Sequence, residues 1–213
     1  MTQYSDIERQ AGAMILSQLK MFNEAVVVFE NQIDGAFWKG FDQCVDRFLK
    51  DNNWKGEAEY GQKEYCWLAP KSWEQITDVP KYFFETHNTT VSEVDYYLAV
   101  ITGVGTEQAS FGFRFKVNIE LFGGKRKFTE FVKNINPLHR EQLRSLGFDD
   151  LANGEFFFPV LLNANQLAEC WQEYGYFPAD HEIFSPLNNA MEKLMDAVPF
   201  IDEIFSSSFK NNE

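Results

Sequence analysis

Basic side chains gather in one part of this otherwise acidic sequence. Residues 111–144 hold eight Lys or Arg and only three Asp or Glu, whereas the whole chain has a formal net charge of -13 at pH 7. Grouped ammonium and guanidinium groups bind phosphates and carboxylates, and they also bind acidic protein surfaces. The sequence therefore predicts an anion-binding or partner-binding site that comprises Arg114, Lys116, Glu120, Lys125, Arg126 and Lys127.

A simpler interpretation of this basic segment is that its cations pair with acids of the same protein. The chain has 32 Asp or Glu against 19 Lys or Arg, so carboxylates are abundant. Most charge clusters on small domains are solvated faces or weak surface ion pairs. We favour this interpretation over a ligand site, and the ligand site remains the alternative.

The chain contains no motif that indicates an active site, a metal or a nucleotide. The Gly-Val-Gly segment 103–105 begins like a dinucleotide-binding loop, but Gln108 stands where the third glycine belongs. The Asp-His-Glu segment 180–182 puts three potential metal ligands side by side. Adjacent side chains point in different directions, however, and rarely share one ion. We therefore expect no catalytic residue, no metal and no cofactor.

The segment Phe111–Leu121 has the clearest structural pattern, because apolar and non-apolar residues alternate along it without a break. A period of two is typical of a strand with one side in the protein core. The apolar side carries Phe, Val, Ile and Leu, and the other side carries Arg114, Lys116 and Glu120. We expect the charged side to face water or a partner.

An apolar stripe with helical spacing runs through the N-terminal region, from near Ser5 to about Gln32. The intervals between its members alternate between four and three residues. Such a narrow apolar stripe lets one helix pack along another. The predicted helix interface consists of Ile15, Leu19, Phe22, Val26, Phe29 and Ile33. Asp34 is predicted to cap a second helix. The short connection favours an antiparallel helix pair within the chain, and the alternative is a helix that forms a homodimer or binds a partner.

The remaining patterns predict an α+β protein. We expect strands at 64–73, 94–102, 111–121 and 154–163, and helices at 128–135, from Pro137, from Asn165 and from Ser185. Because the strands cluster, we expect a mainly antiparallel sheet of about four strands packed by helices, with an N-terminal helix pair. A helical segment 1–52 and an α+β domain 53–213 are expected to form one compact unit.

Cysteine usage and hydropathy indicate a soluble, cytoplasmic protein. Three cysteines at wide spacing are typical neither of a disulfide framework nor of a zinc site. The N-terminus lacks the basic-then-apolar order of a secretory signal. No apolar run approaches the roughly 18 to 20 residues that a membrane helix needs. We therefore expect no membrane partner.

The C-terminal third is strongly acidic. Residues 145–213 carry twelve Asp or Glu and only two Lys. Such a surface repels nucleic acids and attracts basic proteins, although solubility explains it equally well. Direct binding of nucleic acid is therefore disfavoured.

These observations suggest three functions. The first is a non-enzymatic protein-binding module, meaning an inhibitor, an immunity-type protein or an accessory subunit, that binds another protein through its acidic and helical surfaces. The second is an enzyme that acts on an anionic small molecule or a phosphodiester at the basic face around Arg114 and Lys116. The third is an acidic nucleic-acid mimic directed at a defence or repair enzyme. We rank the binding module first, because the chain has no catalytic spacing.

Overall fold

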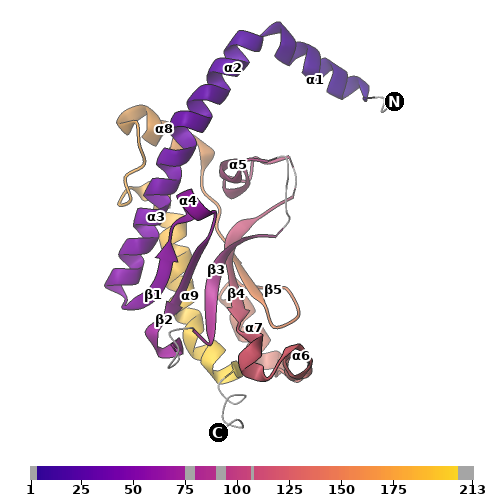
Figure 1. Cartoon of the computed structure of the whole chain (residues 1–213), viewed down its shortest axis with the longest axis vertical. Helices are drawn as coiled ribbons and strands as arrows, with labels where there is room; N and C mark the ends of the chain where they lie inside the picture. The colour runs from indigo at the N-terminus through magenta and orange to yellow at the C-terminus, as the bar shows by residue number, and fades with distance from the viewer. Residues whose placement is uncertain (1–3, 75–79, 90–94, 107, 206–213) are drawn as a thin grey trace.

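The structure of this chain is a computed structural model that describes residues 4–74, 80–89, 95–106 and 108–205. Helices pack against one antiparallel sheet, and the chain begins with helices (Figure 1). The predicted α+β class is therefore confirmed. The sheet has six strands, more than the four or so that we expected.

The sheet is a meander with one change of order at its far edge. Strands β1 to β4 follow one another in space as in sequence, each antiparallel to the next, and β6 then lies between β4 and β5. The strands are β1 (Trp54–Ala58), β2 (Cys66–Pro70), β3 (Tyr82–Asn88), β4 (Phe111–Val117), β5 (Asp149–Asp150) and β6 (Phe156–Pro159). The alternating segment thus supplies a central strand.

Strand β4 keeps the predicted alternation but ends four residues earlier than expected. Its three phenylalanines are buried on one side, and its two cations lie on the other. After Val117 the chain forms a short 3₁₀ helix, η3 (Ile119–Phe122). The side-chain oxygen of Asn118 accepts a hydrogen bond from the backbone N–H of Glu120 at 3.3 Å, a local turn that competes with strand pairing. Glu120 therefore does not share the strand face with the two cations.

The predicted strand 94–102 is wrong in its described part. Residues there form the short helix α5 (Tyr97–Ile101), and residue 94 lies outside the described residues. The hydroxyl of Thr102 donates to the carbonyl of Leu98 at 2.7 Å, which closes the last turn. A short apolar run fits a buried strand and a buried helix equally well. The strand that pairs with both β2 and β4 is β3, which the sequence patterns did not predict.

The N-terminal region is helical, as predicted, but its helices do not form an antiparallel pair. Helix α1 (Asp6–Ser17) begins with a capping box between Ser5 and Glu8. Three segments then form one continuous helix, because the backbone stays helical through both junctions. They are α2 (Leu19–Val28), the π-helical segment η1 (Phe29–Ile33) and α3 (Asp34–Asp51). Asp34 caps no new helix, and its carboxylate instead accepts a hydrogen bond from Trp38 Nε1 at 3.2 Å.

The later helices lie close to their predicted positions. Asn136 caps one of them by accepting a hydrogen bond from the N–H of Leu138 at 3.0 Å. Asn163, rather than the predicted Asn165, caps the next. The remaining helical segments are α4 (Tyr60–Lys63), η2 (Lys71–Trp73), α6 (Lys125–Lys133), α7 (Pro137–Ser145), α8 (Ala164–Tyr174), η4 (Glu182–Phe184) and α9 (Ser185–Phe205).

Helices α3 and α9 pack against the same face of the sheet (Figure 1). On this face the ring of Phe111 lies 5.8 Å from that of Phe41 in α3. The ring of Phe115 lies 5.2 Å from that of Phe205 in α9. Phenylalanine rings need no polar partner, so they can fill this core completely. The packing holds β4 rigidly and fixes where its charged side points.

Candidate functional site

The two cations of β4 are paired with an internal acid. Glu85 stands directly opposite Arg114 on the neighbouring strand β3 and is only 7% exposed. Arg114 Nε lies 3.1 Å from Glu85 Oε1, and Lys116 Nζ lies 3.4 Å from the same oxygen. This carboxylate neutralises much of the positive charge that the sequence placed on the strand. Arg114 and Lys116 are therefore engaged in ion pairs within the sheet, and a ligand would have to compete with Glu85 for them.

His87 belongs to the same charged cluster. Its Nε2 atom lies 3.4 Å from Arg114 Nη1, and Arg114 also lies 3.7 Å from a carboxylate oxygen of Glu155. Burial lowers the pKa of His87 below its ordinary value, and the positive charge of Arg114 lowers it further. The imidazole is therefore uncharged near neutral pH. An uncharged imidazole adds no further positive charge beside Arg114 and Lys116.

The other predicted basic residues lie beyond the end of β4. Glu120 is in η3, and Lys125, Arg126 and Lys127 form the first turn of α6. Within the described part of the chain, none of these four side chains makes an ion pair. The six residues predicted as one site thus fall into two groups, one paired inside the sheet and one exposed to solvent.

A hollow of about 640 Å³ lies between α6 and the turn that joins β5 to β6. We call it the basic hollow, because Lys125, Lys133 and Arg140 contribute to its lining, together with the apolar side chains of Phe128 and Val132. Arg140 is engaged, since its two terminal nitrogens bind an Asp150 oxygen at 2.7 Å and a backbone carbonyl at 2.9 Å. Two lysines remain to meet an anion here. A hollow of this volume is large enough for a small organic ligand.

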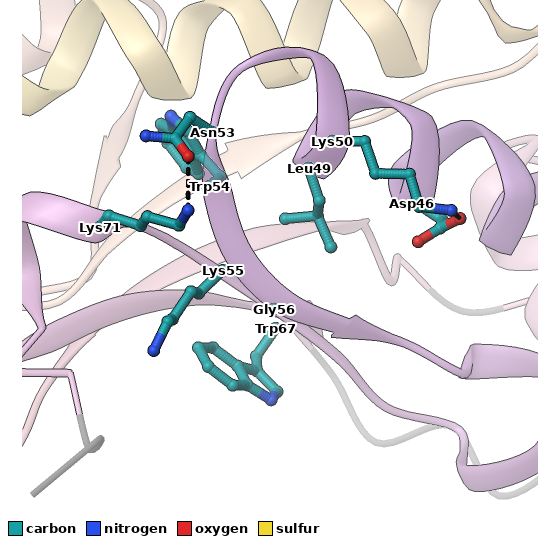
Figure 2. Close-up of a pocket in the computed structure, with 9 residues that line it drawn as sticks. All are labelled: Asp46, Leu49, Lys50, Asn53, Trp54, Lys55, Gly56, Trp67 and Lys71. Carbon is teal, nitrogen blue, oxygen red and sulfur yellow. Dashed lines mark hydrogen bonds and ion pairs between the residues drawn. The ribbon is translucent and has the colours of Figure 1, made fainter.

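A second hollow, the lysine hollow, was not predicted from the sequence. It has a volume of about 570 Å³, and Lys50, Lys55 and Lys71 line it together with Trp67 (Figure 2). Each lysine already has a polar partner: Asp46, Glu74 and Asn53, respectively. The lysines come from α3, β1 and η2, so no local sequence pattern predicts that they lie together. An anion would have to displace these contacts, and we assign the lysine hollow no function.

The most unusual surface of the molecule is its N-terminal helical arm, defined as residues 6–28. Neither α1 nor α2 contains a buried residue. The arm extends away from the sheet, and α1 is bent by 85° from the helix that follows it (Figure 1). Its exposed large apolar side chains are Ile7, Met14, Ile15, Leu16, Leu19, Met21, Phe22, Val27 and Val28. Monomeric soluble proteins rarely leave so many large apolar side chains exposed on one segment, and exposed apolar surfaces mark binding sites.

The predicted helix interface divides between this arm and the body of the protein. Ile15, Leu19 and Phe22 lie on the arm and are 40%, 55% and 46% exposed. At the other end, the ring of Phe29 packs 4.7 Å from that of Tyr96. The hydroxyl of Tyr96 also donates to Glu30 at 2.8 Å, which fixes the base of the arm against α5. The stripe therefore runs from uncovered surface on the arm to Ile33, which packs against the core.

An apolar hollow of about 370 Å³ lies at the base of the arm, between η1, α5 and α8. Phe29 and Ile33 contribute from η1, Leu98 from α5, and Leu167 and Trp171 from α8. Almost all of its surface is carbon, so water gains little by filling it. The hollow lies at the end of the helix that carries the arm, because η1 is the direct extension of α2.

Three further observations bear on function. Among the described residues, no group of three or more His, Cys, Asp or Glu could hold a metal ion. No single described helix is long and apolar enough to cross a membrane, and among the described helices only α1 and Leu19–Asp51 taken together, with an 85° bend between them, meet that length and composition. Comparison with family models, curated proteins and solved structures found no match to this chain.

Proposed function

We propose that this protein is a non-enzymatic binding module that associates with another protein chain through the arm. The observation that supports this proposal is the combination of nine exposed large apolar side chains with a complete lack of buried residues in α1 and α2. Burying one such side chain stabilises a complex by about 1.5–3 kcal/mol. The arm is therefore an apolar helical surface that gains free energy when another protein covers it.

Helix stability leads to the same proposal. Helix α1 has 12 residues, and isolated helices shorter than about 12–15 residues are marginally stable in water. Neither the core nor the sheet supports α1, because none of its residues is buried. Its capping box favours a helix that begins at Asp6 but contributes only about 1 kcal/mol. A partner that packs against α1 would supply the missing stabilisation.

Native purification with three matched baits tests the proposal. The baits are the wild-type chain, an arm variant with Phe22→Asp and Val26→Asp, and Lys20→Asp, which changes the net charge by the same amount on the same helix. We expect the wild type and Lys20→Asp to recover the same partner in a stoichiometric amount, and the arm variant to lose it. Equal recovery by all three baits, or a clean monomeric eluate from the wild type, would contradict the proposal.

A second candidate is binding and turnover of an anionic small molecule at the basic hollow. It is supported by Lys125 and Lys133, whose ammonium groups meet no ion-pair partner within the described residues, beside an apolar lining that could hold the rest of a ligand. The test is a thermal-shift screen with inorganic phosphate, nucleotides and acyl phosphates. We expect any stabilisation to disappear in Lys125→Ala, Lys133→Ala and to persist in Arg126→Ala, Lys127→Ala, whose residues do not line the hollow. The absence of stabilisation by every anion would remove this candidate.

A further inference from the structure

We infer that the chain covering the arm is a second copy of this protein, and that α1 of each copy seats in the apolar hollow of the other. This inference rests on the proposed function and names its partner. Such an arrangement is an isologous exchange of arms, in which two-fold symmetry gives each copy one inserted helix and one filled hollow.

The apolar side of α1 has the spacing of a helix that docks in a groove. Ile7, Ala11, Met14 and Ile15 follow one another at i, i+4, i+7 and i+8, so they lie on one face of the helix. Recognition of an amphipathic helix by an apolar groove uses this pattern of anchors. Methionine adapts to irregular apolar gaps, and Met14 is among the most exposed of these side chains.

The hollow cannot be filled by α1 of the same copy in this fold. The helix from Leu19 to Ile33 separates the end of α1 from the hollow by about 20 Å at 1.5 Å per residue. At the far end of that rigid helix, α1 departs at 85° and extends away from the body (Figure 1). An α1 helix that reaches the hollow must therefore come from another molecule.

The exposed apolar area of the whole arm is comparable to what a stable dimer buries. The nine large apolar side chains of α1 and α2 together present on the order of 800 Å² per copy at their observed exposures, and Ile7, Met14 and Ile15 of the docking face supply part of it. A standard stable interface buries about 800 Å² per partner. The apolar hollow supplies the receiving surface, and its side chains come from three separate elements that the core already holds in place.

Sedimentation equilibrium of the full chain tests the inference with one variant on each side of the contact. We expect a dimer for the wild type. Met14→Glu on the arm and Ala168→Glu at the exposed edge of the hollow should each weaken self-association by at least about 100-fold, because each buries an unpaired charge. Ala13→Glu on α1 and Gln166→Glu on α8 are the controls, since both add the same charge at exposed positions on the opposite sides of these helices.

Cross-linking locates the contact directly. The three native cysteines are buried, so a short bismaleimide should react only with cysteines that are introduced at the surface. When Met14→Cys and Ala168→Cys proteins are mixed, we expect a cross-linked dimer that neither protein gives alone and that Ala13→Cys, on the opposite side of α1, does not give.

The outcomes separate this inference from the proposed function. A dimer that persists in Ala168→Glu, or that fails to cross-link, overturns the seating of α1 in the hollow. If the wild-type chain stays monomeric while its arm still captures a different protein, the partner is not a second copy of this chain, but the proposed binding function stands. A monomer whose arm captures nothing removes both.

Discussion

Glu85 shows how a buried carboxylate changes the role of basic residues on a sheet. It faces Arg114 across the β3–β4 ladder and also lies within 3.4 Å of Lys116. A charge in this position is stable only while its partners remain, because removing one side leaves an uncompensated charge in a poorly solvated place. The network is therefore expected to stabilise the sheet through mutual compensation.

Removing Glu85 should be costly, whereas removing the exposed Glu120 should not. We expect Glu85→Ala to lower the free energy of unfolding by about 2–3 kcal/mol, because two cations lose their common partner. Glu120→Ala should change it by less than about 0.5 kcal/mol. Urea denaturation of the two variants measures the difference. Equal changes in the free energy of unfolding would mean that the buried charge network does not stabilise the fold.

The protonation of His87 reports on the same network. We expect an NMR titration midpoint below the ordinary value of about 6.5, because burial and the Arg114 charge both oppose protonation. A depressed histidine pKa contributes stability that is present above the unfolded pKa and is lost as the pH falls through the folded pKa.

Replacing Arg114 provides the control for this assignment. In Arg114→Gln the midpoint of His87 should rise, while in Lys193→Gln, whose ion-pair partner is Asp196 in α9, it should stay unchanged. If the titration midpoint of His87 is the same in Arg114→Gln as in the wild type, burial alone lowers the pKa of His87.

At the scale of elements, the sequence predicted best where the pattern was long and one-sided. The alternation over β4, the helical spacing that begins near Ser5 and the Ser185 start of α9 each combine a periodic apolar side with a clear boundary, and all three elements are present. Local chemistry decides such elements, so one sequence suffices to find them.

The elements that were missed depend on tertiary contacts. Residues 97–101 are a short apolar run that either structure could bury, and their position beside the arm selects the helix. Strand β1 lies in a polar, glycine-containing stretch and is held by its five-residue ladder to β2. The junction at Asp34 looked like a cap, yet the preceding residues continue the helix with a π-helical segment. The basic hollow joins α6 to a distant turn, which spacing alone does not reveal.

Two glycines of α3 test how tightly that helix is packed. A Cβ at Gly40 would lie 2.4 Å from the carbonyl oxygen of Phe177, whereas a Cβ at Gly35 would meet nothing within 4 Å. We expect Gly40→Ala to destabilise the protein by about 1–3 kcal/mol through overpacking. Gly35→Ala should stabilise it by roughly 0.5–1 kcal/mol through helix propensity. Thermal unfolding measures both, and a tolerated Gly40→Ala would contradict the close approach of α3 to the Phe177 backbone.

The whole molecule combines a closed aromatic core with an open apolar arm. The core holds the sheet against α3 and α9, and the same continuous helix that contributes α3 to this core extends outward as α2. The packed helix α3 therefore determines the direction in which the arm extends. The helical structure of the arm is expected to gain its stability from a partner that covers it.

Amide hydrogen exchange of the arm tests the central claim most directly, because exchange is slow only where a helix is stabilised by packing. It is measured by mass spectrometry on wild-type protein in its native assembly, on Phe22→Asp, Val26→Asp and on the charge-matched Lys20→Asp. We predict that residues 19–28 exchange at least roughly tenfold more slowly in the wild type and in Lys20→Asp than in the arm variant, with β3 and β4 unchanged. Equally fast exchange of the arm in all three proteins would contradict a covered arm.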